Sequence, residues 1–388
     1  MKNFLPLSVP IIDGKEKEYV NECLETGWVS SAGKFVDRFE DEISSYTKST
    51  YSIACMNGTS ALHTSLVLSG VEADNEVIVP SLTFIAPINT VKYVGAHPVF
   101  MDSDNDFNID VDKTISFLLD ETYLKNIKGK MVCINKKTKR AIKAIVVVHV
   151  FGNTVLMDDL LEVCEDRNIK IIEDASESLG SKFAKGRYAN EHSGTIGHFG
   201  CLSFNGNKII TCGSGGMILT QDKVYSEKAK YLTTQAKDDM ERFIHNEVGY
   251  NYRMSNVQAA IGCAQLESLD ERIRKKRIIH NMYSDQLEET ADFAIHKPSN
   301  VSKSNFWLMI LKIKNSSIDP LKIMEQLKKE KIETRPIWQL NHLQKPYEDC
   351  QNYKIENSYD LLNTSLCIPS SPDIDEHDVV RIVRALSA

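Results

Sequence analysis

The segment Ala144-Ile145-Val146-Val147-Val148-His149-Val150-Phe151 is the longest apolar run in the chain. Apart from His149 it contains no polar side chain, and most of its residues are β-branched. A run of this kind predicts a strand that is covered on both faces, as the strands of parallel sheets are. It is far shorter than the roughly 20 apolar residues that a membrane-spanning helix needs.

Further strand-like runs lie on either side of this segment, and helical patterns separate them. Helices are predicted at 61–68 and 156–167. The other strand-like runs lie at 77–79, 98–101, 169–172, 201–204 and 217–220. Strands that alternate with helices predict an α/β fold with a mostly parallel sheet.

The chain becomes more helical after Gln221. Ser255 and Gln258 have the spacing of a capping box, and the apolar pattern that follows predicts one helix from there towards Glu289. Beyond Lys297 the sequence predicts a smaller α+β segment, with a strand at 306–313 and helices at 319–331 and 375–386.

We expect two domains from these patterns and from the length of 388 residues. Residues 1–250 are predicted to form a large domain with an N-terminal arm. Residues 251–388 are predicted to form a linking helix and a small C-terminal domain. A basic, polar stretch at 124–141, around Asn135-Lys136-Lys137-Thr138, predicts a surface hairpin.

Charge and cysteine content argue against several classes of protein. The chain has 46 Lys and Arg against 53 Asp and Glu, a formal net charge of −7, which is atypical of nucleic-acid binders. Its densest basic run, 272–277, has a helical pattern and predicts a solvated helix face. Nine scattered cysteines without a C-x-x-C pair argue against a disulfide framework and a zinc site. Since residues 1–10 lack a signal-peptide pattern, we expect a cytoplasmic protein with reduced thiols, no metal site and no membrane partner.

The first segment with chemical potential is Asn57-Gly58-Thr59-Ser60, which leads into a predicted helix. A glycine turn at a helix N-terminus offers free N–H groups and the positive end of the helix dipole, and both suit a phosphate. The alternative is an ordinary helix cap by Thr59 or Ser60. The sequence has no G-x-G-x-x-G and no Walker A motif, which disfavours a dinucleotide or P-loop site.

Two further segments follow predicted strands. Glu173-Asp174-Ala175-Ser176-Glu177-Ser178 offers a carboxylate that could bind a metal, act as a base or pair with a cationic ring, or simply cap the next helix. Lys208 lies between a strand and the Gly-rich stretch 209–216. Lysine forms Schiff bases with carbonyl cofactors, although a loop lysine is usually just solvated.

Together the three segments fit one cofactor. Pyridoxal phosphate needs a lysine for its aldehyde, an acid for its pyridine nitrogen and a cup for its phosphate. In open α/β sheets, ligands bind beyond the carboxyl ends of the strands, where these segments are expected. The sequence therefore predicts a site for pyridoxal phosphate.

Several short motifs occur in a characteristic order along nearly the whole chain. They are Gly27-Trp28-Val29-Ser30-Ser31, Phe39-Glu40, Asn57 to His63, Pro80 to Phe84, Glu173-Asp174-Ala175, the Lys208 segment, Gly249 to Ser255, and Thr334 to Trp338 with His342. In this ordered set the chain resembles the sugar-nucleotide aminotransferases of the DegT/DnrJ/EryC1/StrS family. The segments 204–208 and 234–239, with the insertion around Asn135, look most similar to the legionaminic-acid-pathway branch of that family.

The resemblance implies a fold, a reaction and an assembly. The fold would be the aspartate aminotransferase-like fold type I of enzymes that use pyridoxal phosphate, with the cofactor in the large domain. The reaction would move the amino group of L-glutamate to C4 of a nucleotide-linked 4-keto-6-deoxy sugar, such as UDP- or GDP-2-acetamido-2,6-dideoxy-hexos-4-ulose. The product would serve bacterial surface-glycan biosynthesis, for example of lipopolysaccharide. The assembly would be a homodimer with shared active sites.

The resemblance also implies roles for individual residues. Lys208 would be the catalytic residue that binds the cofactor covalently. The other cofactor-binding residues would be Gly58, Thr59, Ser60, Phe84, Asp174, Glu177, Ser203, Asn205 and, from the second subunit, Asn251. The substrate-binding residues would be Trp28, Ser30, Arg253, Trp307, Arg335 and His342. The chain departs from the family at two of these positions, because the family often has Gln in place of Glu177 and His in place of Asn205.

Other interpretations remain open from the sequence. Phe84 and Trp307 have patterns typical of core residues, Arg335 is typical of the surface, and His342 could simply be exposed. The substrate could be of the GDP-perosamine type or a 3-keto sugar. A sugar dehydratase on the same fold would have His in place of Lys208. A regulator that binds the cofactor or a nucleotide sugar without catalysis is the remaining alternative.

Overall fold

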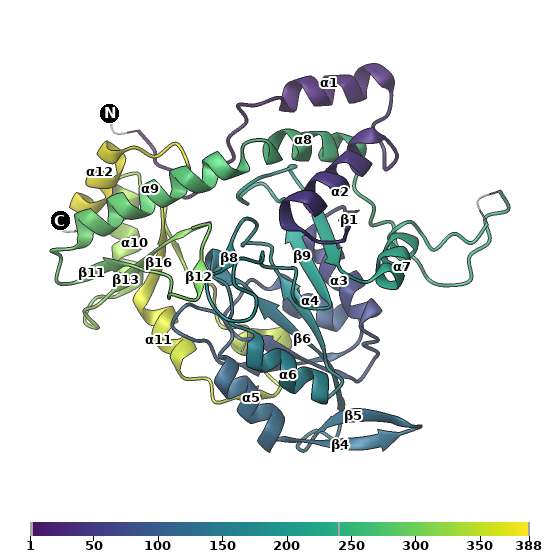
Figure 1. Cartoon of the computed structure of the whole chain (residues 1–388). Coiled ribbons are helices and arrows are strands. Elements are labelled where there is room, and N and C mark those ends of the chain that lie inside the picture. The colour runs from purple at the N-terminus through teal and green to yellow at the C-terminus, as the bar shows by residue number, and fades with distance from the viewer. Residues whose placement is uncertain (1–2, 240, 387–388) are drawn as a thin grey trace.

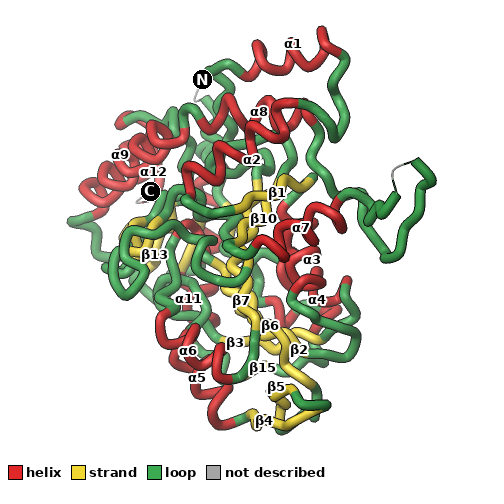
Figure 2. Tube along the Cα trace, turned by 45° about the vertical axis from the view of Figure 1, so that its right-hand side comes forward, coloured by secondary structure: helices red, strands yellow, loops and turns green. Residues whose placement is uncertain are grey.

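The structure, a computed structural model, describes residues 3–239 and 241–386. Within these residues, ten strands form the main sheet, and eight of them lie in the order β1-β10-β9-β7-β6-β2-β3-β15, while a hairpin of β4 and β5 joins through β5 to β6. Figures 1 and 2 show this sheet surrounded by helices. The strands are β1 (Tyr51–Cys55), β2 (Glu76–Pro80), β3 (His97–Met101), β4 (Thr122–Ile127), β5 (Lys130–Asn135), β6 (Ala141–Val148), β7 (Lys170–Asp174), β9 (Phe199–Ser203), β10 (Gly216–Thr220) and β15 (Asn352–Tyr353).

Most neighbouring strands of the main sheet run parallel. This holds for every neighbouring pair from β9 through β7, β6, β2 and β3 to β15. In contrast, β10 is antiparallel to both β1 and β9, and β5 is antiparallel to β6. The prediction of a mixed, mostly parallel sheet is confirmed, and each predicted strand of this region is present.

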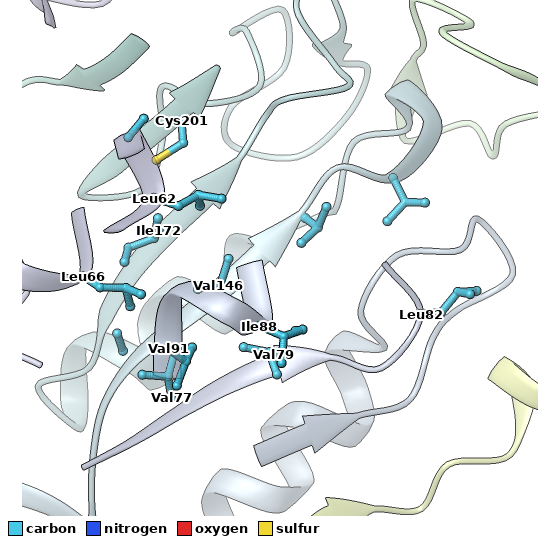
Figure 3. Close-up of a cluster of buried hydrophobic side chains, with 14 of the residues drawn as sticks. Leu62, Leu66, Val77, Val79, Leu82, Ile88, Val91, Val146, Ile172 and Cys201 are labelled. Atoms are coloured by element: carbon cyan, nitrogen blue, oxygen red, sulfur yellow. The ribbon is translucent and has the colours of Figure 1, made fainter. Parts of the chain in front are cut away.

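Strand β6 is buried on both faces, as its apolar run predicted. Ala144, Val146 and Val148 lie in the core cluster on one side of the sheet, whereas Ile145 and Val147 lie in the cluster on the other side. Figure 3 shows the first cluster, in which side chains of helices α3 and α4 meet those of the central strands. Because successive side chains of a strand point to opposite faces, a continuous apolar run requires cover on both.

The helices of the larger part of the molecule cover both faces of the main sheet. Helices α3, α4 and α7 pack on one face, whereas α5 and α6, with α1, α2 and α8 near β1, pack on the other. Among the described helices, none is both long and apolar enough to cross a membrane. Their bounds are α1 (Glu16–Thr26), α2 (Lys34–Thr47), α3 (Gly58–Leu68), α4 (Ala86–Tyr93), α5 (Val111–Asp120), α6 (Asp158–Asp166), α7 (Lys223–Thr233) and α8 (Asn256–Leu266).

A second, four-stranded sheet lies in the C-terminal part of the chain, in the order β11-β13-β16-β14. Helices α9, α10 and α12 share its core, and Leu5 from the N-terminal arm joins them. The two-residue strand β15 from this part of the chain pairs with β3 of the main sheet. The bounds are α9 (Leu269–Leu287), β11 (Phe293–Ile295), β13 (Met309–Ile313), α10 (Pro320–Lys329), β14 (Arg335–Pro336), α11 (Asn357–Thr364), β16 (Ser365–Ile368) and α12 (Glu376–Leu386). The domain boundary at residue 250 stays a prediction.

Short elements complete the described chain. Strands β8 and β12 form a two-stranded sheet, and three single turns of 3₁₀ helix occur. Their bounds are β8 (Lys182–Phe183), β12 (Ser302–Lys303), η1 (Val150–Gly152), η2 (Asn341–Leu343) and η3 (Lys345–Tyr347). The predicted surface hairpin is confirmed as β4 and β5, and its Asn135 is buried, where it donates to Glu76 at 2.7 Å and to Gln351 at 2.9 Å.

The single long helix predicted after Ser255 is wrong in one respect. The capping box of Ser255 and Gln258 is present, but the helix is interrupted between α8 and α9. At the interruption the amide of Ser268 donates to Gln265 O, three residues back instead of four, at 3.3 Å. A local switch to this tighter hydrogen bonding ends an α-helix.

The prediction that the basic run 272–277 is solvated is also wrong for two of its side chains. Arg272 and Lys276 are buried, and they share one face of α9 because they lie four residues apart. The Nζ of Lys276 donates to Trp307 O at 2.8 Å and to Ser370 O at 2.6 Å. Burial lowers the pKa of Lys276 to about 7. Carbonyl groups of irregular chain segments thus allow a lysine in the interior.

Asp102, just after β3, ties the main sheet to α11. Its carboxylate accepts hydrogen bonds from the amides of Glu356, Asn357 and Ser358 at 2.9–3.0 Å, and from Lys113 Nζ at 2.8 Å. It therefore caps a helix that begins 255 residues later in the chain. Burial alone would raise the pKa of Asp102, but the Lys113 ammonium and the hydrogen bonds of Ser358 and Glu356 outweigh it and lower the pKa to about 2.

We expect Asp102→Asn to lower the free energy of unfolding by about 2 kcal/mol at pH 7. Because the folded state depresses the pKa of this carboxyl group, its contribution is present above pH 4 and is lost as the pH falls towards 2. The difference in the free energy of unfolding between wild type and variant should therefore be about half as large at pH 3 as at pH 7. Urea unfolding, followed by circular dichroism between pH 7 and 3, measures it. Asp112→Asn, at an exposed position of α5, is the control. A difference between wild type and Asp102→Asn that stays constant with pH would contradict the role of Asp102.

Candidate active site

A cavity of about 350 Å³ opens where β7 and β9 end and α3 begins. The two strands are parallel neighbours, so Asp174 and Ser203 at their carboxyl ends leave the sheet close together. Lys208 reaches the same cavity from the loop after β9. Its lining comprises Asn57, Gly58, Thr59, Leu62, Phe84, Ala86, Asp174, Ser176, Glu177, Ser203, Asn205, Asn207, Lys208, Ser214, Trp307 and Trp338. The structure thus brings the three segments singled out in the sequence into one site.

One end of the cavity is formed by the first turn of α3. Asn57 caps this helix, with its Oδ1 accepting from Ser60 N at 2.8 Å, so the alternative of a cap by Thr59 or Ser60 is wrong. The amides of Gly58 and Thr59 belong to the first turn, which has no acceptors for them within the helix. A Cβ on Gly58 would lie 2.9 Å from Ser203 Cβ and 3.3 Å from Ser176 Oγ, which shows how closely both hydroxyl side chains approach these amides. Free amides, hydroxyls and the positive end of a helix dipole together suit a phosphate.

Asp174 supplies a buried carboxyl group at the end of β7. Its Oδ1 accepts a hydrogen bond from the amide of Ser176 at 3.0 Å, and its side chain lines the cavity. Burial raises the pKa of Asp174, while the hydrogen bonds with Ser176 and the nearby Lys208 act in the opposite direction. A cationic group in the cavity would therefore find a poorly solvated acid beside it, which an opposite charge keeps ionised.

The neighbouring Glu173 serves the structure of the strand end instead. Its carboxylate accepts from the amides of Gly194, Ile196 and Gly197 at 2.6–2.8 Å, and from His149 Nε2 at 2.8 Å. His149 Nδ1 accepts from a backbone amide, so the proton of the neutral ring lies on Nε2. Because adjacent strand residues point to opposite faces, Glu173 is bound on one face while Asp174 reaches the cavity on the other.

Lys208 lies between a carboxylate and an aromatic ring. Its Nζ is 3.5 Å from Glu177 Oε1 and 4.0 Å from the centroid of the Trp307 ring. Trp307 is positioned by its own Nε1, which donates to Asn207 O at 2.7 Å. The amine is therefore held by an ion pair and a cation–π contact.

Three aromatic side chains form part of the wall of the cavity. Trp307 and Trp338 stack with centroids 6.4 Å apart, and Phe84 lies 6.5 Å from Trp338. Phe84 precedes α4 in a loop and is 52% exposed, so the alternative of a core residue is wrong for it. Trp307 is buried, as a core residue would be, and it also lines the cavity; its role in substrate binding stays a prediction.

Two of the predicted site residues outside the cavity lie just before α8. The Nη1 of Arg253 donates to Glu40 and to Ala54 O, the latter at 3.4 Å. Its side chain is only 7% exposed. Asn251 is exposed and forms a β-bridge with Thr234. Within one chain, neither residue reaches Lys208.

The remaining predicted residues also lie away from the cavity. His342 is buried, between Ser81 Oγ at 2.6 Å and Tyr359 OH at 3.0 Å, so the alternative of an exposed histidine is wrong. Arg335 is exposed and pairs with Glu333 at 2.9 Å. The other three, Ser60 on α3 and Trp28 and Ser30 between α1 and α2, do not line this cavity.

Five polar or aromatic residues at the cavity were not among the predicted site residues, and neither were the aliphatic Leu62 and Ala86. The five are Asn57, Ser176, Asn207, Ser214 and Trp338. The first four lie within the segments that the sequence analysis selected, so their short polar side chains were the available signal. Trp338 is the last residue of the motif Thr334 to Trp338. Only its contacts with the other aromatic rings in the folded chain place it at the site.

Comparison with known proteins points to one family. The model of the DegT/DnrJ/EryC1/StrS aminotransferase family matches residues 10–387. The GDP-perosamine synthase of Escherichia coli O157:H7 is 35% identical over 99% of this chain and 98% of its own length. A DegT DnrJ EryC1 StrS aminotransferase from Brucella abortus has a TM-score of 0.85 and 25% identity over 96% of this chain and 94% of its own.

A further structural neighbour was solved with bound hydrated pyridoxal phosphate. This GDP-4-keto-6-deoxy-D-mannose-3-dehydratase from Escherichia coli has a TM-score of 0.85 over the whole of both chains, at 21% identity, and shares the fold. The expected fold type I is thereby confirmed. In the present chain, the amides of α3 with Ser176 and Ser203, the carboxyl group of Asp174 and the amine of Lys208 are the three groups that this cofactor requires. The residues of the cavity fit pyridoxal phosphate.

Gly58→Ala should weaken the binding of pyridoxal phosphate at least tenfold, which is about 1.4 kcal/mol. The added methyl group would occupy the space between the α3 amides and Ser203. Pyridoxal, which lacks the phosphate, should bind almost unchanged. Absorbance titration of the cofactor-free protein measures both affinities.

The control for this experiment is Gly206→Ala, which adds the same methyl group at a position with no atom within 4 Å. Equal weakening of both ligands by Gly58→Ala would show that the phosphate is bound elsewhere.

Proposed function

Since the chain belongs to the DegT/DnrJ/EryC1/StrS aminotransferase family, we propose that it transfers the amino group of L-glutamate to C4 of a nucleotide-linked 4-keto-6-deoxy sugar. Its cofactor is pyridoxal phosphate. The observation that carries the proposal is the meeting of Lys208, Asp174 and the N-terminus of α3 in one cavity.

In the proposed reaction, each of these residues of the cavity has its own role. When bound, pyridoxal phosphate supplies an aldehyde that binds amines and a ring that accepts the electrons of a bond to the donor carbon. Asp174 holds the proton of the ring nitrogen, because an opposite charge favours the protonated form. Lys208 Nζ binds the cofactor and, when free, moves a proton from the donor carbon. Gly58, Thr59 and Ser203 would hold the phosphate, and Phe84 would supply an aromatic surface for the cofactor ring.

Two classes of sugar are candidates for the substrate. The motifs of this chain resemble the legionaminic-acid branch, which favours a UDP- or GDP-linked 2-acetamido sugar. A GDP-perosamine-type substrate is the second candidate, favoured by the 35% identity to a GDP-perosamine synthase. The proposed product enters bacterial surface-glycan biosynthesis, and the proposed location is the cytoplasm.

We further propose a homodimer with shared active sites. Asn251 lies outside the cavity of its own chain and is exposed, which suits a contact with the phosphate in a second subunit. Trp28, Ser30, Arg335 and His342 stay predicted substrate-binding residues, as does Arg253.

The substrate proposal predicts a selective product. Incubation with L-glutamate and a panel of nucleotide-linked 4-keto-6-deoxysugars should convert at least one member to a 4-amino sugar, detected by mass spectrometry. UDP- and GDP-linked sugars, with and without a 2-acetamido group, separate the two candidates. Lys208→Ala should form no product, because no other side chain that lines the cavity carries an amine; circular dichroism should show that the variant is folded. Amination of a 3-keto sugar alone would overturn the C4 assignment.

The shared site predicts complementation between two inactive variants. Lys208→Ala and Asn251→Asp homodimers should each be nearly inactive, the second because its carboxylate repels the phosphate. In a mixed two-fold dimer, one site would carry both lesions and the other neither. Reassociation of an equal mixture should therefore restore up to about a quarter of wild-type activity.

Subunit exchange in that mixture is verified by mass spectrometry of differently tagged chains. If Asn251 served the site of its own subunit, every site would carry one lesion. Activity would then stay at the level of the homodimers, and the shared-site proposal would fail.

A further inference from the structure

Glu177 is a buried carboxyl group next to Lys208 that the mechanism above does not use. Its side chain is 4% exposed, and its Oε1 lies 3.5 Å from the Nζ of the lysine. Across residues 3–239 and 241–386, it is the carboxylate that forms an ion pair with Lys208. A buried carboxylate beside the amine on which the reaction depends is a candidate for a role in that reaction.

The place of Glu177 is set by the backbone rather than by its charge. Its Oε2 accepts from the amide of Phe151 at 2.8 Å, and its carbonyl accepts from Asn305 Nδ2 at 2.9 Å. Phe151 has a φ of 56°, in the left-handed region that residues other than glycine rarely adopt. A glutamine at position 177 could accept the same hydrogen bond, so charge and position can be tested separately.

The groups that face Glu177 make its charge depend on Lys208. They are Lys208 itself, Asp174 on the same turn and the thiol of Cys367 on β16. The pKa of Glu177 is raised to about 7, chiefly by burial; Lys208 and the amide of Phe151 act to lower it, and the negative charge of Asp174 acts to raise it. Burial also raises the pKa of Cys367, so this thiol stays neutral. The carboxyl group is thus ionised when the lysine beside it is charged.

We propose that Glu177 is the counter-ion of Lys208 and holds the lysine, together with its proton, inside the cavity whenever the lysine is not bound to the cofactor. The inference rests on the proposed function, in which Lys208 alternates between bound and free. Ammonium with carboxylate, and amine with carboxylic acid, contain the same atoms and the same net charge. A proton can therefore pass from Nζ to Oε1 and back without exchange with solvent. Glu177 acts through Lys208 and is a positioning residue.

The test measures the protonation of free Lys208 without turnover. Full-length protein is loaded with pyridoxamine phosphate, which leaves the lysine unbound, and is labelled briefly with acetic anhydride between pH 6 and 11. Mass spectrometry of the Lys208 peptide gives the labelling rate at each pH. Loss of an opposite charge lowers the pKa of an amine. In Glu177→Gln the midpoint should fall by about one pH unit or more, which makes labelling at pH 8 about tenfold faster.

Two further variants keep this test decisive. Glu227→Gln removes the exposed partner of Lys223, 3.7 Å away on α7, and should leave the Lys208 midpoint unchanged. Glu177→Asp keeps the charge but shortens its reach, and should give a midpoint between wild type and Glu177→Gln. It also replaces the glutamine variant if that protein does not fold.

An unchanged midpoint in Glu177→Gln, or one shifted upwards, would overturn the inference. The labelling uses no sugar, so it is independent of the substrate panel. A protein that aminates no sugar but shows the shift would refute the proposed function and retain the ion pair. A protein that aminates a sugar without the shift would refute only the role of Glu177.

Discussion

The parallel pairing of β7 with β9 is the constraint on which the active site depends. It aligns Asp174 with Cys201, so that the acid and the serine two residues further along leave the sheet at the same edge. Helix α3 packs against both strands and brings its N-terminal amides to that edge. The register of this pairing is well defined because the faces of the sheet are buried. A shift by one residue would turn every apolar side chain to the wrong face.

The two adjacent carboxylates at the end of β7, Glu173 and Asp174, differ in how many of their hydrogen bonds the protein supplies. Glu173 is saturated by backbone amides and His149, whereas Asp174 accepts one amide and retains capacity towards the cavity. Burial of two adjacent carboxyl groups is costly unless each is hydrogen-bonded. The hydrogen bonds of Glu173 with backbone amides and His149 offset this cost. For Asp174 the amide of Ser176 offsets it in part, together with the other groups that line the cavity. The strand end is therefore fixed before any ligand binds.

Trp307 and Trp338 in the cavity wall come from a distant part of the sequence. Trp307 is held at its carbonyl by the buried Lys276, at its amide by Asn305 Oδ1 and at its ring nitrogen by Asn207. The same Asn305 binds the carbonyl of Glu177. One set of hydrogen bonds thus positions both neighbours of the Lys208 amine, the aromatic ring and the carboxylate. A movement of the C-terminal part of the chain would therefore displace Trp307 and change its contact with Lys208.

The sequence by itself determined the strands of the main sheet and three parts of the site: the start of α3, Asp174 and Lys208. Local patterns predict these features, because apolar periodicity and glycine turns extend over only a few residues. Only the tertiary structure decided that Glu177 pairs with Lys208, that Trp338 lines the cavity and that Lys276 is buried. Each of these depends on contacts between residues at least 30 positions apart. Such contacts are selected by the packing of whole elements, and no local pattern encodes them.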